Sequence, residues 1–149
     1  MPDQSLYGAH IAHRRDQIDT LLNAHGYDAL LIHSGRLEYP RFDDRARPFR
    51  VHGHFNAWVP LPYADDCLLE LRSGQRPVLW YYQPKDFWHL PPATPDHWWA
   101  QEFDIRVVSE WREWLPLFEA PEALAAIGAE WALQGLGERV DLNPRELLM

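Results

Sequence analysis

The feature that most constrains this chain is the apolar run Tyr27–His33, within which Ala29-Leu30-Leu31-Ile32 has no polar side chain. A strand that is apolar on both faces has to be covered on both faces, which is typical of a central strand in an α/β sheet. The preceding segment, Ser5–Ala24, repeats apolar residues at spacings near three and four. This spacing predicts a helix with Ser5 as its N-cap and Gly26 as its stop. A helix leading into a central strand predicts the α/β class, with a mixed central sheet flanked by helices.

The rest of the chain alternates between short apolar stretches and turn residues. Asp66–Leu71 and Pro77–Tyr82 flank Ser73-Gly74, and two strands around a Gly-containing turn predict a β-hairpin. We expect a single domain over residues 1–149, because this length suits one hydrophobic core. The pattern also predicts strands at 103–108, 125–128 and 140–143, short helices at 110–118 and 130–134, and a weakly alternating, extended segment at 49–58.

A last helix is predicted to begin at Pro144, with Asn143 as its N-cap. This helix has barely begun when the sequence ends at Met149. The end is either a frayed native terminus or a cut in a longer chain, and we expect the cut.

The charge balance argues against binding to nucleic acid. The chain has 14 Lys and Arg against 22 Asp and Glu, a net charge of −8, and an acidic surface repels phosphate backbones. No apolar run approaches the ~20 residues that cross a membrane, and the N-terminus does not resemble a signal peptide. Cys67 is the single cysteine, so no disulfide forms within the chain. We therefore expect a cytoplasmic protein without nucleic-acid or membrane partners.

The histidines were the first candidates for a metal site. His10 and His13 lie on one face of the predicted helix, and His52 and His54 are spaced to share one face of a strand. Zinc needs three or four converging ligands, and a third partner is missing near both pairs. We therefore expect no metal site in this chain.

Nucleophilic catalysis has little support in the sequence. Ser34 follows a buried strand, but the neighbouring His33 would point to the opposite face, so we expect a strand-ending turn here. Cys67 lies in an apolar strand and is expected to be an inert core thiol. Adjacent carboxylates remain as candidates. Asp43-Asp44 either bind a cationic group or cap a turn, whereas Asp65-Asp66 at a strand start are expected to be solvated.

The segment Asp86–Trp99 contains three tryptophans, two histidines and three prolines. Prolines restrict the backbone and reduce the entropy that is lost when a loop becomes ordered. Trp and His side chains on such a loop suit the rim of a binding site. We interpret Trp98-Trp99 as anchors onto the sheet and Trp88-His89 as projecting residues.

Several stretches, in their order along the chain, resemble the N-terminal domain of bacterial Xaa-Pro dipeptidases (prolidases), a group that includes the organophosphorus acid anhydrolases. Two departures from the family pattern are Arg47-Pro48-Phe49-Arg50, where Tyr-Pro-Phe-Lys is usual, and Val51-His52-Gly53, where Val-Asn-Pro is usual. The resemblance rests on Leu6-Tyr7, His10-Ile11-Ala12, Tyr27–Gly35, Phe42-Asp43-Asp44, Pro48-Phe49-Arg50-Val51, Phe55–Pro60 and Asp86–His89.

The resemblance implies a creatinase/prolidase-type, ribonuclease-H-like domain that is not itself catalytic. The family's C-terminal "pita-bread" domain, which holds two metal ions, commonly manganese, is absent from these 149 residues. The resemblance therefore implies no cofactor in this chain, and activity only in a full-length Xaa-Pro dipeptidase. It implies that the domain packs on its own catalytic domain, forms a homodimer and covers the partner's active site. Asp44 would be a substrate-binding residue that contacts the ammonium of a dipeptide, with Trp88 and His89 at the pocket rim.

Two other classes of function stay open on the residues alone. The chain fits a free-standing module that binds a small ligand or a protein without peptidase activity. It also fits an enzyme in its own right, in which Asp43, Asp44 and a histidine act as acid and base.

Overall fold

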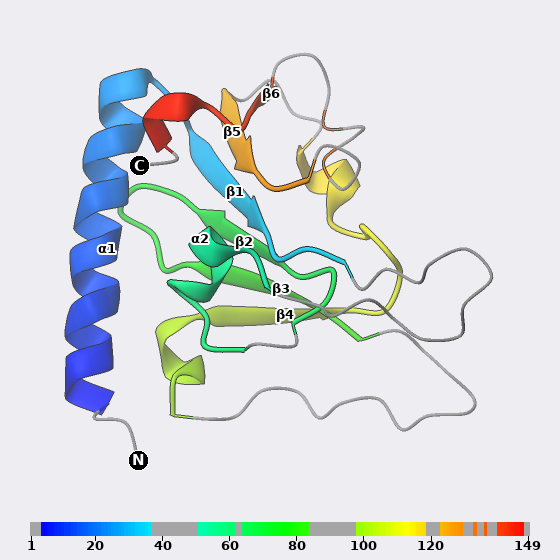
Figure 1. Cartoon of the computed structure of the whole chain (residues 1–149), viewed down its shortest axis with the longest axis horizontal. Coiled ribbons are helices and arrows are strands. Elements are labelled where there is room, and N and C mark those ends of the chain that lie inside the picture. The colour runs from blue at the N-terminus through cyan, green and yellow to red at the C-terminus, as the bar shows by residue number, and fades with distance from the viewer. Residues whose placement is uncertain are drawn as a thin grey trace.

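The structure is a computed structural model that describes residues 4–36, 51–61, 64–83, 98–118, 123–129, 133, 136 and 140–147. Within these ranges the chain forms a central sheet with helices against it (Figure 1). None of the helices in these ranges is long and apolar enough to span a bilayer. The helices are α1 (Gln4–His25) and α2 (Gly53–Asn56), with short 3₁₀ helices η1 (Ala100–Glu102), η2 (Leu115–Phe118) and η3 (Arg145–Leu147).

The sheet is mixed, as the sequence predicts. Its strands lie in the order β4-β3-β2-β1-β5-β6. β2 is antiparallel to both of its neighbours, β1 and β3, whereas the pairs β3–β4, β1–β5 and β5–β6 are parallel. Every described strand except β2 therefore points the same way, and the α/β class is confirmed. The strands are β1 (Ala29–His33), β2 (Leu68–Leu71), β3 (Val78–Tyr82), β4 (Asp104–Val108), β5 (Leu124–Ile127) and β6 (Val140–Leu142).

β1 is the central strand that the apolar run predicts, and it is buried along its whole length. Leu30 and Ile32 face a core that α1 and α2 cover, where Ile11 and Phe55 pack. Ala29 and Leu31 face a second core on the other side of the sheet. A layer on each face of the sheet therefore explains why this run carries no polar side chain. The second core is closed by Trp114, Phe118, Leu133 and Leu136.

The predicted first helix, the β-hairpin and the strands predicted at 103–108, 125–128 and 140–143 are all found, and Gly26 stops α1 with a φ of 72°. Ser5 is not the N-cap, because α1 already begins at Gln4. The extended segment predicted at 49–58 is wrong where it is described, since residues 53–56 are helical. The His52 side chain accepts a hydrogen bond from the His54 amide at 3.3 Å and caps this short helix instead.

The helix predicted at 110–118 is also shorter and tighter than expected. Arg112 has a φ of 54°, which a regular helix does not allow, so residues 111–114 form a turn before η2. Asn143 does not act as the predicted N-cap. Its side-chain amide instead exchanges two 2.9 Å hydrogen bonds with the backbone of Gly128, which fastens the end of β6 to the end of β5.

The close approach of Gly128 to β1 gives a test of the fold. Gly128 has a φ of 148°, and a Cβ there would lie 3.0 Å from the Cβ of His33. We expect Gly128→Ala to lower the free energy of unfolding by about 1–3 kcal/mol in urea denaturation. Gly53→Ala is the control, because a Cβ at Gly53 has open space around it, and it should stay within about 1 kcal/mol of the parent. Equal effects of the two substitutions would contradict the packing at Gly128.

Candidate functional site at the carboxyl edge of the sheet

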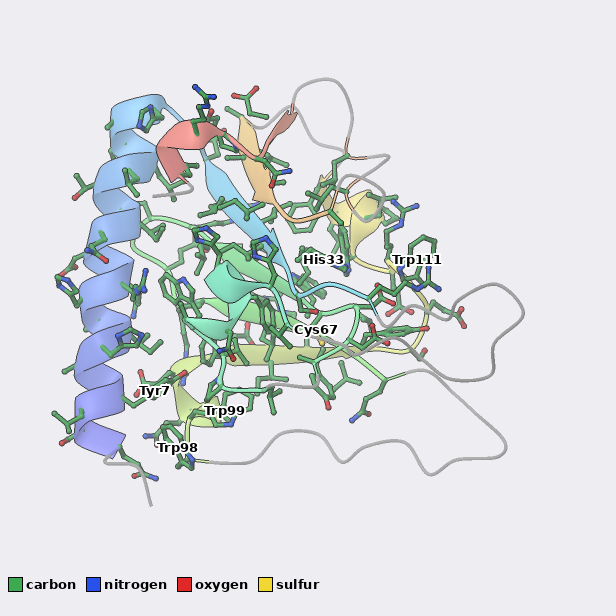
Figure 2. All side chains as sticks on the ribbon, viewed as in Figure 1. Tyr7, His33, Cys67, Trp98, Trp99 and Trp111 are labelled. Atoms are coloured by element: carbon green, nitrogen blue, oxygen red, sulfur yellow. The ribbon has the colours of Figure 1, made fainter. Side chains whose placement is uncertain are left out.

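The carboxyl ends of β1, β3, β4 and β5 lie at one edge of the sheet, where ligands of α/β proteins usually bind. Polar and aromatic residues gather there. His33 ends β1, Asp66 precedes β2, and Trp111 follows β4. Figure 2 shows His33 and Trp111 at this end of the sheet, away from α1. We call His33, Arg36, Asp66, Trp111 and Arg112 the edge cluster.

Asp66 is the centre of the edge cluster. Its side chain is buried, and its carboxylate accepts a hydrogen bond from the Trp111 indole at 3.2 Å. The Arg36 Nε lies 3.4 Å from Oδ2, and the His33 Nε2 lies 3.6 Å from Oδ1. The backbone of Asp66 has a φ of 53°, and its amide donates to the carbonyl of Gly35 at 2.8 Å. The expectation that Asp66 is solvated is therefore wrong, because this left-handed turn directs the carboxylate into the protein.

His33 is neutral at pH 7. Its Nδ1 accepts a hydrogen bond from the Gly35 amide at 3.0 Å, which assigns the ring proton to Nε2, the atom facing Asp66. Burial, together with the positive charges of Arg112 and Arg36 and the neighbouring His52, lowers the pKa of His33 to about 4. The contact with Asp66 is therefore between a neutral imidazole and a carboxyl group, and it is too long for a strong hydrogen bond.

Asp66 is a weaker acid than an ordinary aspartate. Burial raises its pKa to about 6, and the nearby charge of Asp65 adds to this effect. Arg36, the Trp111 hydrogen bond and Arg112 act in the opposite direction without overcoming the desolvation. A buried carboxyl that titrates near neutrality at the edge of a sheet is a candidate functional group.

Trp111 brings two arginines to the surface of the cluster. The guanidinium carbons of Arg36 and Arg112 lie 4.8 Å and 4.4 Å from the centroid of its ring, which is cation–π geometry. Trp111 is 39% exposed, although its Nε1 is held by buried Asp66. These contacts hold together the residues that follow β1, precede β2 and follow β4. They also place two guanidinium groups beside an exposed indole ring. It provides no activated nucleophile among the described residues.

Ser34 and Cys67 have structural roles, as the sequence predicts. The Ser34 hydroxyl accepts from the Cys67 amide at 2.9 Å, and the Ser34 amide donates to the Cys67 carbonyl at 2.9 Å. The Cys67 thiol is 1% exposed, and burial raises its pKa to about 12, which makes it unreactive. Ser34 thus links β1 to the chain that leads into β2.

The predicted substrate-binding residue Asp44 lies outside the described residues, but both ends of the segment that carries it are described. The segment begins after Arg36, whose guanidinium forms an ion pair with the carboxylate of Asp66. It returns at His52, whose amide donates to the carbonyl of Ser34 at 2.8 Å. Both ends are therefore fastened at the carboxyl edge, beside the edge cluster.

Trp88 and His89 also lie outside the described residues. The segment that carries them leaves the same edge after β3, where the Gln83 amide donates to the Val108 carbonyl at 2.8 Å. It ends at Trp98 and Trp99, which lie near the start of α1 (Figure 2).

The anchoring role predicted for Trp98 and Trp99 is confirmed. Trp98 packs edge-on against Tyr7, with ring centroids 4.9 Å apart. Trp99 is 2% exposed and packs edge-on against Phe103 at 5.9 Å. The Tyr7 hydroxyl in turn donates to the Trp58 carbonyl at 2.6 Å, which ties α1 to the chain after α2. The end of the proline-rich segment is therefore part of the core.

Three of the four histidines that suggested a metal site have other contacts. His10 bonds the Ala57 carbonyl at 2.8 Å, and the rings of His52 and His54 stack with centroids 5.6 Å apart. Among the described residues, no group of three or more His, Cys, Asp or Glu side chains lies close enough together to hold a metal ion.

Comparison with known proteins identifies the family. The family model described as "Xaa-Pro dipeptidase, N-terminal domain" matches residues 5–149. The chain belongs to this family. A Xaa-Pro dipeptidase of Xanthomonas campestris pv. campestris is 38% identical over 143 residues, which cover 96% of this chain and 32% of that protein. One from Pectobacterium carotovorum subsp. carotovorum is 39% identical over 147 residues, covering 97% of this chain and 33% of that protein. The chain thus spans about a third of the length of these curated relatives.

The pKa shifts of His33 and Asp66 predict opposite effects of pH on stability. Between pH 3.8 and about 6, native Asp66 holds a proton that the unfolded chain lacks, so its contribution to stability is lost as pH rises. Between about 4 and 6.5, the unfolded chain holds a proton on His33 that the native protein lacks, so that contribution grows as pH rises. In the parent protein the two effects largely cancel.

When His33 or Asp66 is substituted, the pH dependence of stability that comes from the remaining residue is no longer cancelled. Relative to the parent, Asp66→Asn should gain stability as pH rises from about 4 to 6, by up to ~1.4 kcal/mol per pH unit. His33→Asn, which keeps an acceptor for the Gly35 amide, should show the reverse slope. Urea titrations at several pH values measure both. Parallel pH profiles for the parent and both variants would show that the two groups do not titrate as their burial requires.

Proposed function

We propose that this chain is the non-catalytic front domain of a Xaa-Pro dipeptidase, a hydrolase of dipeptides with a C-terminal proline. The observation that carries the proposal is the family match over residues 5–149, together with relatives named Xaa-Pro dipeptidase of which the chain spans about a third. The reaction would then belong to a C-terminal domain, and two metal ions held there, which we propose to be manganese, would supply the Lewis-acid chemistry of peptide hydrolysis. The described residues of this chain contain no such ligand set.

The domain's contribution to that reaction is to cover the active site of the partner subunit in a cytoplasmic homodimer. In this proposal Asp44 meets the ammonium group of the dipeptide in a charge-assisted contact. Trp88 and His89 form part of the pocket rim. The fastening of the Asp44 segment supports this role, because Ser34, His52 and Asp66 hold both of its ends at one edge. A contact residue on a loop needs such a rigid base to keep its position.

A chimera tests whether the chain serves as the front domain. In the Xanthomonas campestris enzyme, the matched third would be replaced by this chain. We expect the chimera, loaded with manganese, to hydrolyse a dipeptide such as Leu-Pro, and the isolated chain to release no proline above the blank. Turnover by the isolated chain would support the reading in which Asp43 and Asp44 act as acid and base. A folded chimera without activity would contradict the proposed function.

The role of Asp44 is tested in the same chimera. Asp44→Asn removes the charge that meets the substrate ammonium while nearly preserving shape. We expect the KM for Leu-Pro to rise by about tenfold or more, with metal content unchanged. Asp16→Asn, at an exposed acid of α1, is the matched control and should leave the kinetics as they are. An unaltered KM in the Asp44 variant would show that this carboxylate does not contact substrate.

A further inference from the structure

A groove of about 400 Å³ lies between α1 and the sheet, and α1 stands away from His33 and Trp111 of the edge cluster (Figure 2). Its floor is apolar and comes from separate elements, with Leu30 of β1 and Ile127 of β5 below and Ile18 of α1 at the side. Leu147 of η3 closes one end, and Thr20 lies on the exposed rim. The groove thus collects apolar side chains from the first helix and from the last described turn.

α1 is incompletely covered at this groove. Among its 22 residues, Ile11 and Leu22 are the buried ones, while Ile18 and Leu21 are only partly buried although they line the groove. Apolar surface that stays in water forfeits the stabilisation that its burial would provide. The groove has an apolar floor and a polar rim that includes Arg14, Gln17 and His54, which is the character of a surface that contacts another segment.

The geometry points to one occupant: the polypeptide that follows η3 in the longer enzymes of this family. The double hydrogen bond between Asn143 and Gly128 fixes the end of β6, and Pro144 then leads the chain into η3. Figure 1 shows η3 beside α1. Leu147, which is 5% exposed, already lies in the groove.

In a longer enzyme, the residues that follow η3 would therefore start beside the groove. Apolar side chains on those residues would extend the packing that Leu147 begins. The relatives supply such a segment, since this chain spans about a third of their length. This inference rests on the proposed function and assigns the groove to contact between the front domain and the rest of the enzyme.

Cysteine labelling distinguishes a covered groove from an open one. Thr20→Cys places a thiol on the exposed rim, and native Cys67 is a silent background because it is buried with a raised pKa. Ala12→Cys, on an exposed position of α1 that does not line the groove, is the matched control. Both variants would be reacted with a maleimide in the isolated chain and in the Xanthomonas campestris chimera, and the rates compared.

We expect the thiol at position 20 to react at least about tenfold more slowly in the chimera than in the isolated chain, while position 12 reacts equally in both. Equal rates at position 20 would overturn the inference, even in a chimera that hydrolyses Leu-Pro. Protection in a folded but inactive chimera would support the inference and count against the proposed function. Protection in the isolated chain that grows with protein concentration would assign the groove to a second copy and overturn the inference.

Discussion

The burial of β1 on both faces is the constraint on which the other features depend. An apolar strand in the middle of the sheet needs a layer on each side, and α1 with α2 and the η2 region provide them. The same central position encloses the carboxyl end of β1 between its neighbours. His33 and Ser34 therefore become buried polar residues, at 1% and 0% exposure. The Gly35 amide donates to the His33 Nδ1 and the Cys67 amide donates to the Ser34 hydroxyl, while the His33 Nε2 lies 3.6 Å from Asp66.

Desolvation, rather than charge attraction, decides the electrostatics of that cluster. Arg36 lies within ion-pair distance of Asp66, yet burial is the larger effect and the pKa of Asp66 rises. The pKa of His33 falls for the same reason. Near pH 5 the unfolded chain carries a protonated imidazole and an ionised carboxylate, whereas folding favours the neutral form of both groups. Within the cluster the buried groups are the imidazole and the carboxyl, while the guanidinium groups of Arg36 and Arg112 lie over the partly exposed Trp111 ring.

The sequence predicted the elements that are determined by residues close together in the chain. The apolar run predicted β1, the Gly-containing turn predicted the β2–β3 hairpin, and the aromatic pair Trp98-Trp99 was recognised as an anchor. The edge cluster was missed because it joins positions far apart in the chain. The Trp111–Asp66 hydrogen bond spans 45 residues and depends on positive φ angles at Asp66 and Arg112. The one available signal was position, since such residues follow or precede strands at the carboxyl edge.

The groove lies against the face of the sheet that α1 covers, whereas the edge cluster lies at the carboxyl edge of the sheet, and this arrangement bears on how the domain works. The segments expected to reach substrate are fastened at the carboxyl edge by Ser34, Asp66 and Gln83. The last described turn contributes Leu147 to the lining of the groove beside α1, and the hydrogen bond between Asn143 and Gly128 holds the chain just before that turn. β1 connects them, because Leu30 lines the groove and His33 ends the same strand at the cluster. A rigid, fully buried strand of this kind holds the two surfaces at a constant separation. A segment that covers the groove is therefore held at a fixed position relative to the carboxyl edge.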